Sequence, residues 1–227
     1  MLIAAAICPP APLLLPGVEG RRRLGLEVSS AALASVQALV DSSVTTVVVL
    51  AEDEGPPPSP EQPLGTWRFG APPAHAASGV ALPLPFVVGM TLLTEAGFAG
   101  EVRLLPLSET TTSEQAAELG RSIVVEGEVG LLLMGNASAC STLRAPGAFR
   151  EDAEEFNDAI VHAVRTLEPS SLTGLSAEAA RDQLSDIRLP LEVLHGALEG
   201  ARFASDIGYA DAPGGVYYVC ASISRVP

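Results

Sequence analysis

The sequence contains no lysine, and all 13 of its basic residues are arginine. This absence excludes enzymes that form a Schiff base on lysine and nucleotide-binding proteins that use a phosphate-loop lysine. The 27 acidic residues give a formal net charge of −14. A nucleic-acid partner is therefore not expected, because such partners are bound mainly through Lys and Arg.

Cysteine is scarce as well. Cys8, Cys140 and Cys220 are far apart and form no C-x-x-C pair, which excludes zinc knuckles and thioredoxin-like redox motifs. Three isolated cysteines are typical of a reducing compartment, so we expect a cytoplasmic protein.

The opening segment "MLIAAAICPPAPLLLPG" is too short an apolar run to span a bilayer, because four prolines interrupt it. Its positive charge, at Arg21 to Arg23, follows the apolar residues, whereas a secretory signal carries its charge before them. We expect no membrane partner and interpret residues 2–8 as a buried strand that is ended by prolines.

Segments with strand character alternate with helical segments along the chain. Apolar runs predict strands at residues 2–8, 43–52, 101–107, 128–134 and 214–223, and a short strand followed by a helix within 80–98. Helical periodicity predicts helices at 19–41, 112–127 (capped by Ser113), 150–167, 176–184 and 189–199. The alternation predicts a single α/β domain over residues 1–227, with a largely parallel or mixed central sheet and helices on both faces.

Residues 53–79 are rich in proline and glycine and are expected to form a long loop. The loop follows directly on a predicted buried strand, so it is a candidate lid, and it carries His75. The other two histidines, His162 and His195, fall in predicted helices, where a structural role is expected.

In α/β folds, ligands bind beyond the carboxyl ends of the strands. The segments "CPPAP", "AEDEG", "GNASAC" and "YADAPGG" occupy such places. Together with the loop histidine they give the candidate cleft residues Cys8, Glu52, Asp53, His75, Asn136, Ser138 and Asp211.

Each of these segments admits a functional and a structural interpretation. The acidic residues after the second strand could hold magnesium or calcium, or form a solvated turn. The turn "GNASACS" could offer N–H groups to an anion, or be a tight turn only. Cys8 could be a nucleophile or a buried apolar residue. Neither Cys8 nor His75 is expected to supply essential core packing.

Four segments, "AAAICPPAPLLLPGV", "LLLMGNASACSTLRAPGAF", "EEFNDAIVHAV" and "DAPGGVYYV", resemble the class III extradiol ring-cleavage dioxygenases of the LigB superfamily, which includes the Memo-like proteins. The resemblance is to an actinobacterial branch of that superfamily, and it implies the α/β fold of these dioxygenases. It also implies an iron(II) site of two histidines and a carboxylate, with a further histidine as acid/base.

At the positions that match the family's motif, this sequence has other residues. Pro10 stands at the first ligand, Glu52 and Asp53 at the second, and Ala139 at the acid/base histidine. The resemblance thus implies a divergent protein without iron or another cofactor that binds a small molecule or acts through protein contacts, and that associates as a homodimer. The alternatives are a metal-dependent oxygenase or hydrolase with a rearranged ligand set, in which a divalent metal is retained, and a purely structural role.

Overall fold

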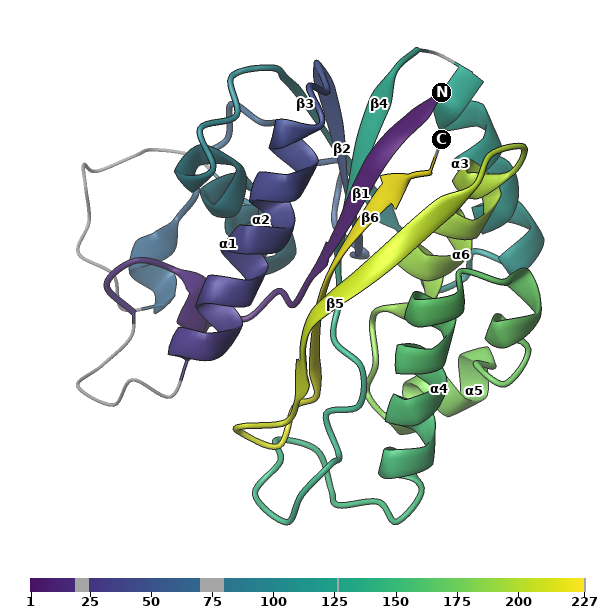
Figure 1. Ribbon diagram of the computed structural model, residues 1–227. Helices are drawn as coiled ribbons and strands as arrows, with labels where there is room; N and C mark the ends of the chain where they lie inside the picture. The colour runs from purple at the N-terminus through teal and green to yellow at the C-terminus, as the bar shows by residue number, and fades with distance from the viewer. Residues whose placement is uncertain (19–24, 70–79, 126, 227) are drawn as a thin grey trace.

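The computed structural model describes residues 1–18, 25–69, 80–125 and 127–226. In this part of the chain, one six-stranded mixed sheet runs through the molecule, with helices on both faces (Figure 1). The strand order is β3-β2-β4-β1-β6-β5. The strands are β1 (Leu2–Cys8), β2 (Thr46–Glu52), β3 (Glu101–Leu107), β4 (Val129–Met134), β5 (Phe203–Asp211) and β6 (Tyr218–Arg225). The predicted α/β fold is confirmed.

Strands β1 to β4 are mutually parallel, and β6 is antiparallel to both of its neighbours, β1 and β5. The central strands are covered on both faces, which explains their uninterrupted apolar runs. All six residues of β4 are buried, as are the five central residues of β2.

Two apolar cores lie on opposite faces of the sheet. One face is covered by α1 (Leu26–Asp41) and α2 (Leu84–Glu95). The other is covered by α3 (Ser113–Val125), α4 (Ala153–Thr166), α5 (Ala177–Asp182) and α6 (Arg188–Leu198) (Figure 1). Short 3₁₀ turns occur at η1 (Pro12–Leu14), η2 (Thr66–Phe69) and η3 (Pro169–Leu172).

Three local expectations were wrong. No strand precedes α2, because residues 80–83 lie outside any strand and two prolines flank the start of the helix. The cap of α3 is Thr112, not Ser113. The Thr112 hydroxyl accepts the N–H of Gln115 at 3.2 Å, and the Gln115 side chain accepts the N–H of Thr112 at 2.9 Å. Strand β5 was not expected, since its residues alternate between half-buried and exposed instead of forming an apolar run.

Cys8 is completely buried in the core on the side of α1, where its thiol donates to the carbonyl oxygen of Ala32 at 3.6 Å. Cys8 is thus a buried apolar residue, and that its packing is not essential to the fold stays a prediction. His75 lies outside the described residues, and so does part of the predicted helix at 19–41, which is described from Leu26.

Helix α6 is buried along its whole length and crosses α3 at close range. Glycines on both helices permit this approach. A Cβ on Gly196 would lie 2.8 Å from the Cα of Ala117, and a Cβ on Gly120 would lie 2.8 Å from the backbone nitrogen of Ala197. Since backbone cannot give way as a flexible side chain can, the two glycines fix the separation of the helices.

Gly196→Ala is expected to lower the free energy of unfolding by about 1–3 kcal/mol, because the added methyl group forces α3 and α6 apart. The measurement is urea denaturation followed by circular dichroism. Gly214→Ala is the matched control, since no atom lies within 4 Å of its added Cβ. The control should stay within about 0.5 kcal/mol of the original protein, and equal stability of the two variants would contradict the close crossing.

Candidate functional site

The carboxyl ends of the four parallel strands meet at one edge of the sheet, where ligand sites of α/β proteins occur. A cavity of about 330 Å³ lies there, between the end of β2 and the segment that joins α5 to α6. We call it the edge cavity, and its charged lining residues are Glu52, Glu109, Arg181, Asp186 and Arg188. Its volume is at the lower end of the usual range for small-molecule sites.

Glu52, the last residue of β2, carries the first of two unusual carboxyl groups in the edge cavity. Its Oε1 accepts the N–H of Leu189 at 3.3 Å, in the first turn of α6. N–H groups in the first turn of a helix lack partners within the helix, and the helix dipole favours negative charge there. Burial nevertheless outweighs this bond and raises the pKa of Glu52 to about 7.

Asp186, two residues before α6, carries the second carboxyl group. Its Oδ1 accepts the N–H of Asn136, which follows β4 by two residues. Burial raises the pKa of Asp186 to about 6 despite that hydrogen bond. The negative charge of Asp186 also contributes to the raised pKa of Glu52. The edge cavity thus has two carboxyl groups that exchange protons near neutral pH, which is the property of general acids and bases.

The "GNASAC" turn does offer an N–H group to an anion, and that anion is the protein's own Asp186. The Ser138 N–H donates to Asn157 Oδ1 at 2.9 Å, and the Cys140 N–H donates to Ser138 Oγ at 2.9 Å. Backbone carbonyl groups accept the N–H groups of the residues between them. The backbone N–H groups of this turn therefore all donate to acceptors within the protein. Gly135 is required for close approach, since a Cβ there would lie 2.7 Å from the Cα of Ile187.

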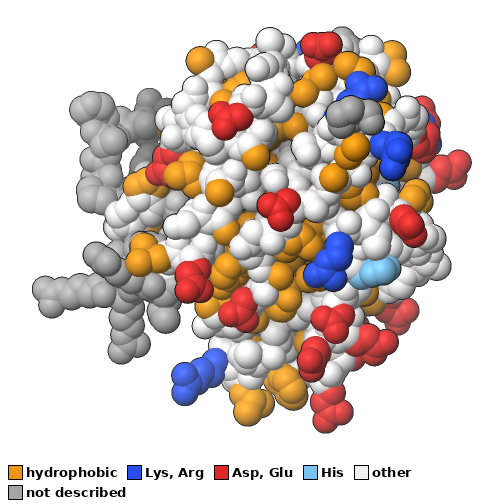
Figure 2. All heavy atoms as spheres, viewed as in Figure 1, with side chains coloured by type: hydrophobic (Ala, Val, Ile, Leu, Met, Phe, Trp, Pro, Cys, Tyr) orange, Lys and Arg blue, Asp and Glu red, His pale blue; other side chains and the backbone are white. Residues whose placement is uncertain are grey.

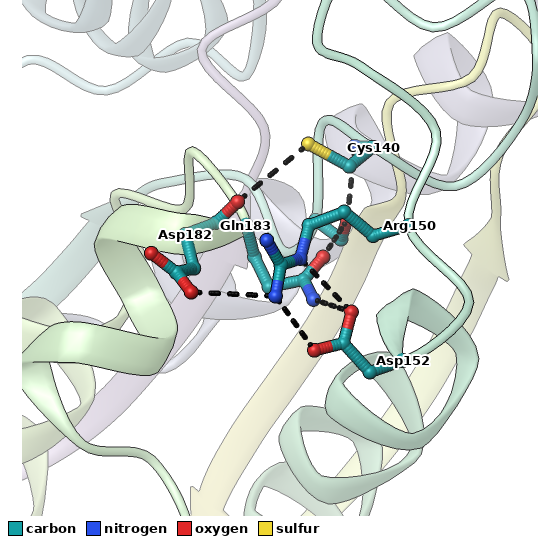
Figure 3. A network of polar contacts seen from close by, with 6 residues as sticks. Cys140, Arg150, Asp152, Asp182 and Gln183 are labelled. Atoms are coloured by element: carbon teal, nitrogen blue, oxygen red, sulfur yellow. Dashed lines mark hydrogen bonds and ion pairs between the residues drawn. The ribbon is translucent and has the colours of Figure 1, made fainter.

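Figure 3 shows a polar network that joins the segment after β4 to α4 and α5, and Ser138 belongs to it through Gln183. Its hydroxyl donates to Gln183 Oε1 at 2.7 Å, and Gln183 Nε2 donates to Asp152 Oδ1 at 2.8 Å. Arg150 bonds Asp152 through two nitrogens at 2.9 Å and lies 3.3 Å from the carboxylate of Asp182. Each of these polar groups has a partner in the protein, so the network fastens the loop to the helices.

Asp152, Asp182 and Gln183 also line a cavity of about 400 Å³ between α4 and α5. Acidic side chains gather over these two helices in Figure 2. The network residues that line this cavity already have partners in the protein.

The remaining sequence candidates lie apart from the edge cavity. Asp53 closes a turn, accepting the N–H of Gly55 at 3.1 Å. Asp211 is exposed at the end of β5, where it accepts the N–H of Ala212 at 2.7 Å. Strand β5 is four positions from β2 in the sheet, which corresponds to about 19 Å. Cys8 faces the other core, and His75 is not described. Among the described candidates, only Glu52 and Asn136 meet at the edge cavity, where Asn136 bonds Asp186 and Glu52 bonds the first turn of α6.

Sequence reasoning missed a group of polar residues in and before α6. Within the helix, Arg188 Nη1 bonds Glu192 Oε1 at 2.7 Å, and both side chains are 7% exposed. His195 follows one turn later and is buried. The spacing of Arg188, Glu192 and His195, at i, i+4 and i+7 in an otherwise apolar helix, marks one polar stripe and could have identified them.

No group of three or more His, Cys, Asp or Glu side chains with a geometry suited to a metal ion occurs in the described part of the chain. Nor do the helices there include one with the length and apolar character needed to cross a membrane.

Glu52→Gln is expected to change how stability depends on pH. The pKa of Glu52 in the folded protein, about 7, exceeds its ordinary value of 4.5, so folding favours the protonated carboxyl. This contribution to stability is full below pH 4.5 and is lost as the pH rises through 7. Glutamine cannot ionise. The free energy of unfolding of the variant should therefore rise relative to that of the original protein by roughly 1–3 kcal/mol between pH 5 and pH 8.

Urea denaturation at pH 5, 6, 7 and 8 measures this difference. Glu95→Gln, at an exposed carboxyl at the end of α2 and outside the edge cavity, is the control. Its offset from the original protein should be the same at all four pH values. A Glu52→Gln curve that runs parallel to that of the original protein would show that Glu52 is not held protonated.

No family model matches the sequence, and no curated protein matches it. Among solved structures, the chain is similar to an uncharacterised protein from Escherichia coli K12, with a TM-score of 0.56. The match covers 97% of this chain and 99% of the other at 15% sequence identity. At that identity the likeness shows a shared fold and nothing about activity.

Proposed function

We propose that the chain is a small-molecule-binding protein of the extradiol dioxygenase type that lacks the iron site, with the edge cavity as its ligand site. The observation that carries the proposal is the pairing of Glu52 and Asp186 at one cavity, where the parallel strands end. Glu52 is the last residue of β2, and Asp186 lies two residues before α6.

The chemistry of the edge cavity favours a polar ligand with hydroxyl or amino groups. A carboxyl group with a pKa near 7, as in Glu52, can donate or accept a hydrogen bond at neutral pH. Arg188 is already paired with Glu192, which leaves Arg181, exposed on α5, as the cation available to a ligand at the rim.

The residues at the family's iron positions do not fit an iron site. Neither Pro10 nor Ala139 has a side-chain atom that can ligate a metal. Glu52 directs one oxygen to the N–H of Leu189. These features support a binding function and give no support to ring cleavage through that metal.

The test is a thermal-shift screen of small polyols, amines and hydroxylated rings at pH 6.5, followed by calorimetric titration of each hit. A ligand of the edge cavity should bind Glu52→Gln at least 10-fold more weakly than the original protein. Asp53→Asn makes a similar change one residue away, outside the cavity lining, and should leave affinity unchanged. Equal affinity for both variants would overturn the assignment of the site.

Metal content provides a separate test of the lost iron site. The protein is purified anaerobically without a tag, exposed to iron(II), zinc, manganese and magnesium, passed through gel filtration and analysed by elemental mass spectrometry. Substoichiometric metal is expected. A stoichiometric metal that survives gel filtration would overturn this part of the proposal and favour a metal-dependent oxygenase or hydrolase with a rearranged ligand set.

A further inference from the structure

Another cavity lies further along α6, away from the edge of the sheet. It has a volume of about 340 Å³ and lies between the start of α3, the η3 turn and α6. We call it the helix cavity. Its lining includes Ser113, Ala117, Leu172, Leu175, Glu192 and His195, so it has apolar walls and a polar end.

The polar end contains buried groups that lack hydrogen-bond partners. Glu192 Oε1 is fully engaged, by Arg188 at 2.7 Å and by the Ser113 hydroxyl at 2.9 Å. Glu192 Oε2 and both ring nitrogens of His195 are buried without a hydrogen bond to any described residue. Glu192 and His195 are each only 6% exposed.

Unmatched polar groups of this kind are uncommon in folded proteins, because each costs the free energy of its lost hydration. Here three unmatched atoms belong to two residues that are one helical turn apart and line the same cavity. A ligand that supplies the missing hydrogen bonds would remove this cost, whereas α6 has no further polar side chain to do so.

The charges at the polar end determine what kind of ligand fits. Arg188 and Glu192 form an ion pair with no net charge. Burial lowers the pKa of His195 to about 4, so its ring is neutral at pH 7 and has one donor and one acceptor. The unmatched set is then two acceptors and one donor. Its complement is a ligand with two donors, one acceptor and no charge.

We propose that the helix cavity binds a neutral small molecule with at least two hydroxyl groups, held by Glu192 and His195 and packed against Ala117, Leu172 and Leu175. One hydroxyl of a diol donates to Glu192 Oε2, and the other bonds the nearer ring nitrogen of His195, as donor or acceptor according to the tautomer. This site is separate from the edge cavity, because the two linings have no residue in common.

The experiment uses nitrogen NMR of the histidine rings in the full chain. The probes are cis-1,2-cyclohexanediol, cyclohexylamine and cyclohexanecarboxylate, which have the same ring but differ in charge. The diol should shift the His195 ring resonances in a saturable manner, and it should bind at least 5-fold more tightly than either charged probe. Unchanged His195 resonances would overturn the proposal, since they indicate a cavity filled with water alone. Tighter binding of a charged probe would overturn the ligand class.

The variants identify the site. His195→Leu places an apolar side chain in the same position and removes both ring nitrogens, so it should weaken diol binding at least 10-fold. His162→Leu, at the other histidine of the described chain, in α4 and outside the cavity lining, is the matched control and should bind as the original protein does. If His195→Leu does not fold, Leu172→Trp, which fills the cavity from the η3 turn, should abolish binding instead. Unchanged binding in the folded variant would overturn the proposal.

The two proposed sites are distinguished by Glu52→Gln, which should leave diol binding in the helix cavity unchanged. If Glu52→Gln and His195→Leu weaken binding equally, the helix cavity is not an independent site and the proposal fails.

Discussion

The burial of α6 between the sheet and α3 is the constraint on which both candidate sites depend. A helix that is buried along its whole length can carry charged side chains only if they are paired, because an isolated charge away from water costs several kcal/mol. Arg188 and Glu192 satisfy this condition for each other. Their pairing uses one oxygen of Glu192, and the other is buried without a hydrogen bond to any described residue. The demands of packing thus create an unmatched polar group.

The start of α6 has a similar effect on the edge of the sheet. Its first-turn N–H groups need acceptors, and Glu52 reaches one of them from β2. The same location removes Glu52 from water, so its carboxyl group resists ionisation. Asp186 accepts an N–H from the turn after β4 and is buried in the same way. The two carboxyl groups that accept these backbone hydrogen bonds are therefore also the groups whose pKa values are raised toward neutral pH.

The sequence predicted the fold well because the fold depends on local patterns. Apolar runs located β1, β2 and β4, and helical periodicity located α4, α5 and α6. Strand β5 was not predicted, because an edge strand with one exposed face has no apolar run. Its "ASD" and "GYAD" segments are mostly small or polar. Patterns along the chain contain little information about a strand defined by its pairing with β6.

The candidate site was harder to predict, since its residues meet through contacts between distant parts of the chain. Glu52 was identified because it ends an apolar strand, but its partner Leu189 is 137 residues away. Asp186 lies between two predicted helices, and His195 lies within the second of them, where polar residues are usually on a solvated face. Nothing in the local pattern showed that α3 would cover α6. The sequence left open whether the turn at Asn136 binds an anion or is a tight turn only, and its hydrogen bond to Asp186 follows only from the folded chain.

The close crossing of α3 and α6 also bears on how such a protein can diverge. Gly120 and Gly196 each face the backbone of the opposite helix, so neither position tolerates a side chain unless the helices separate. Leu172 and Thr173, in the η3 turn and just after it, line the helix cavity from the surface and are free of that restriction. Substitutions there can reshape the cavity without moving either helix. Selection could therefore alter what the protein binds through the η3 segment while the helix pair stays the same over long evolutionary times.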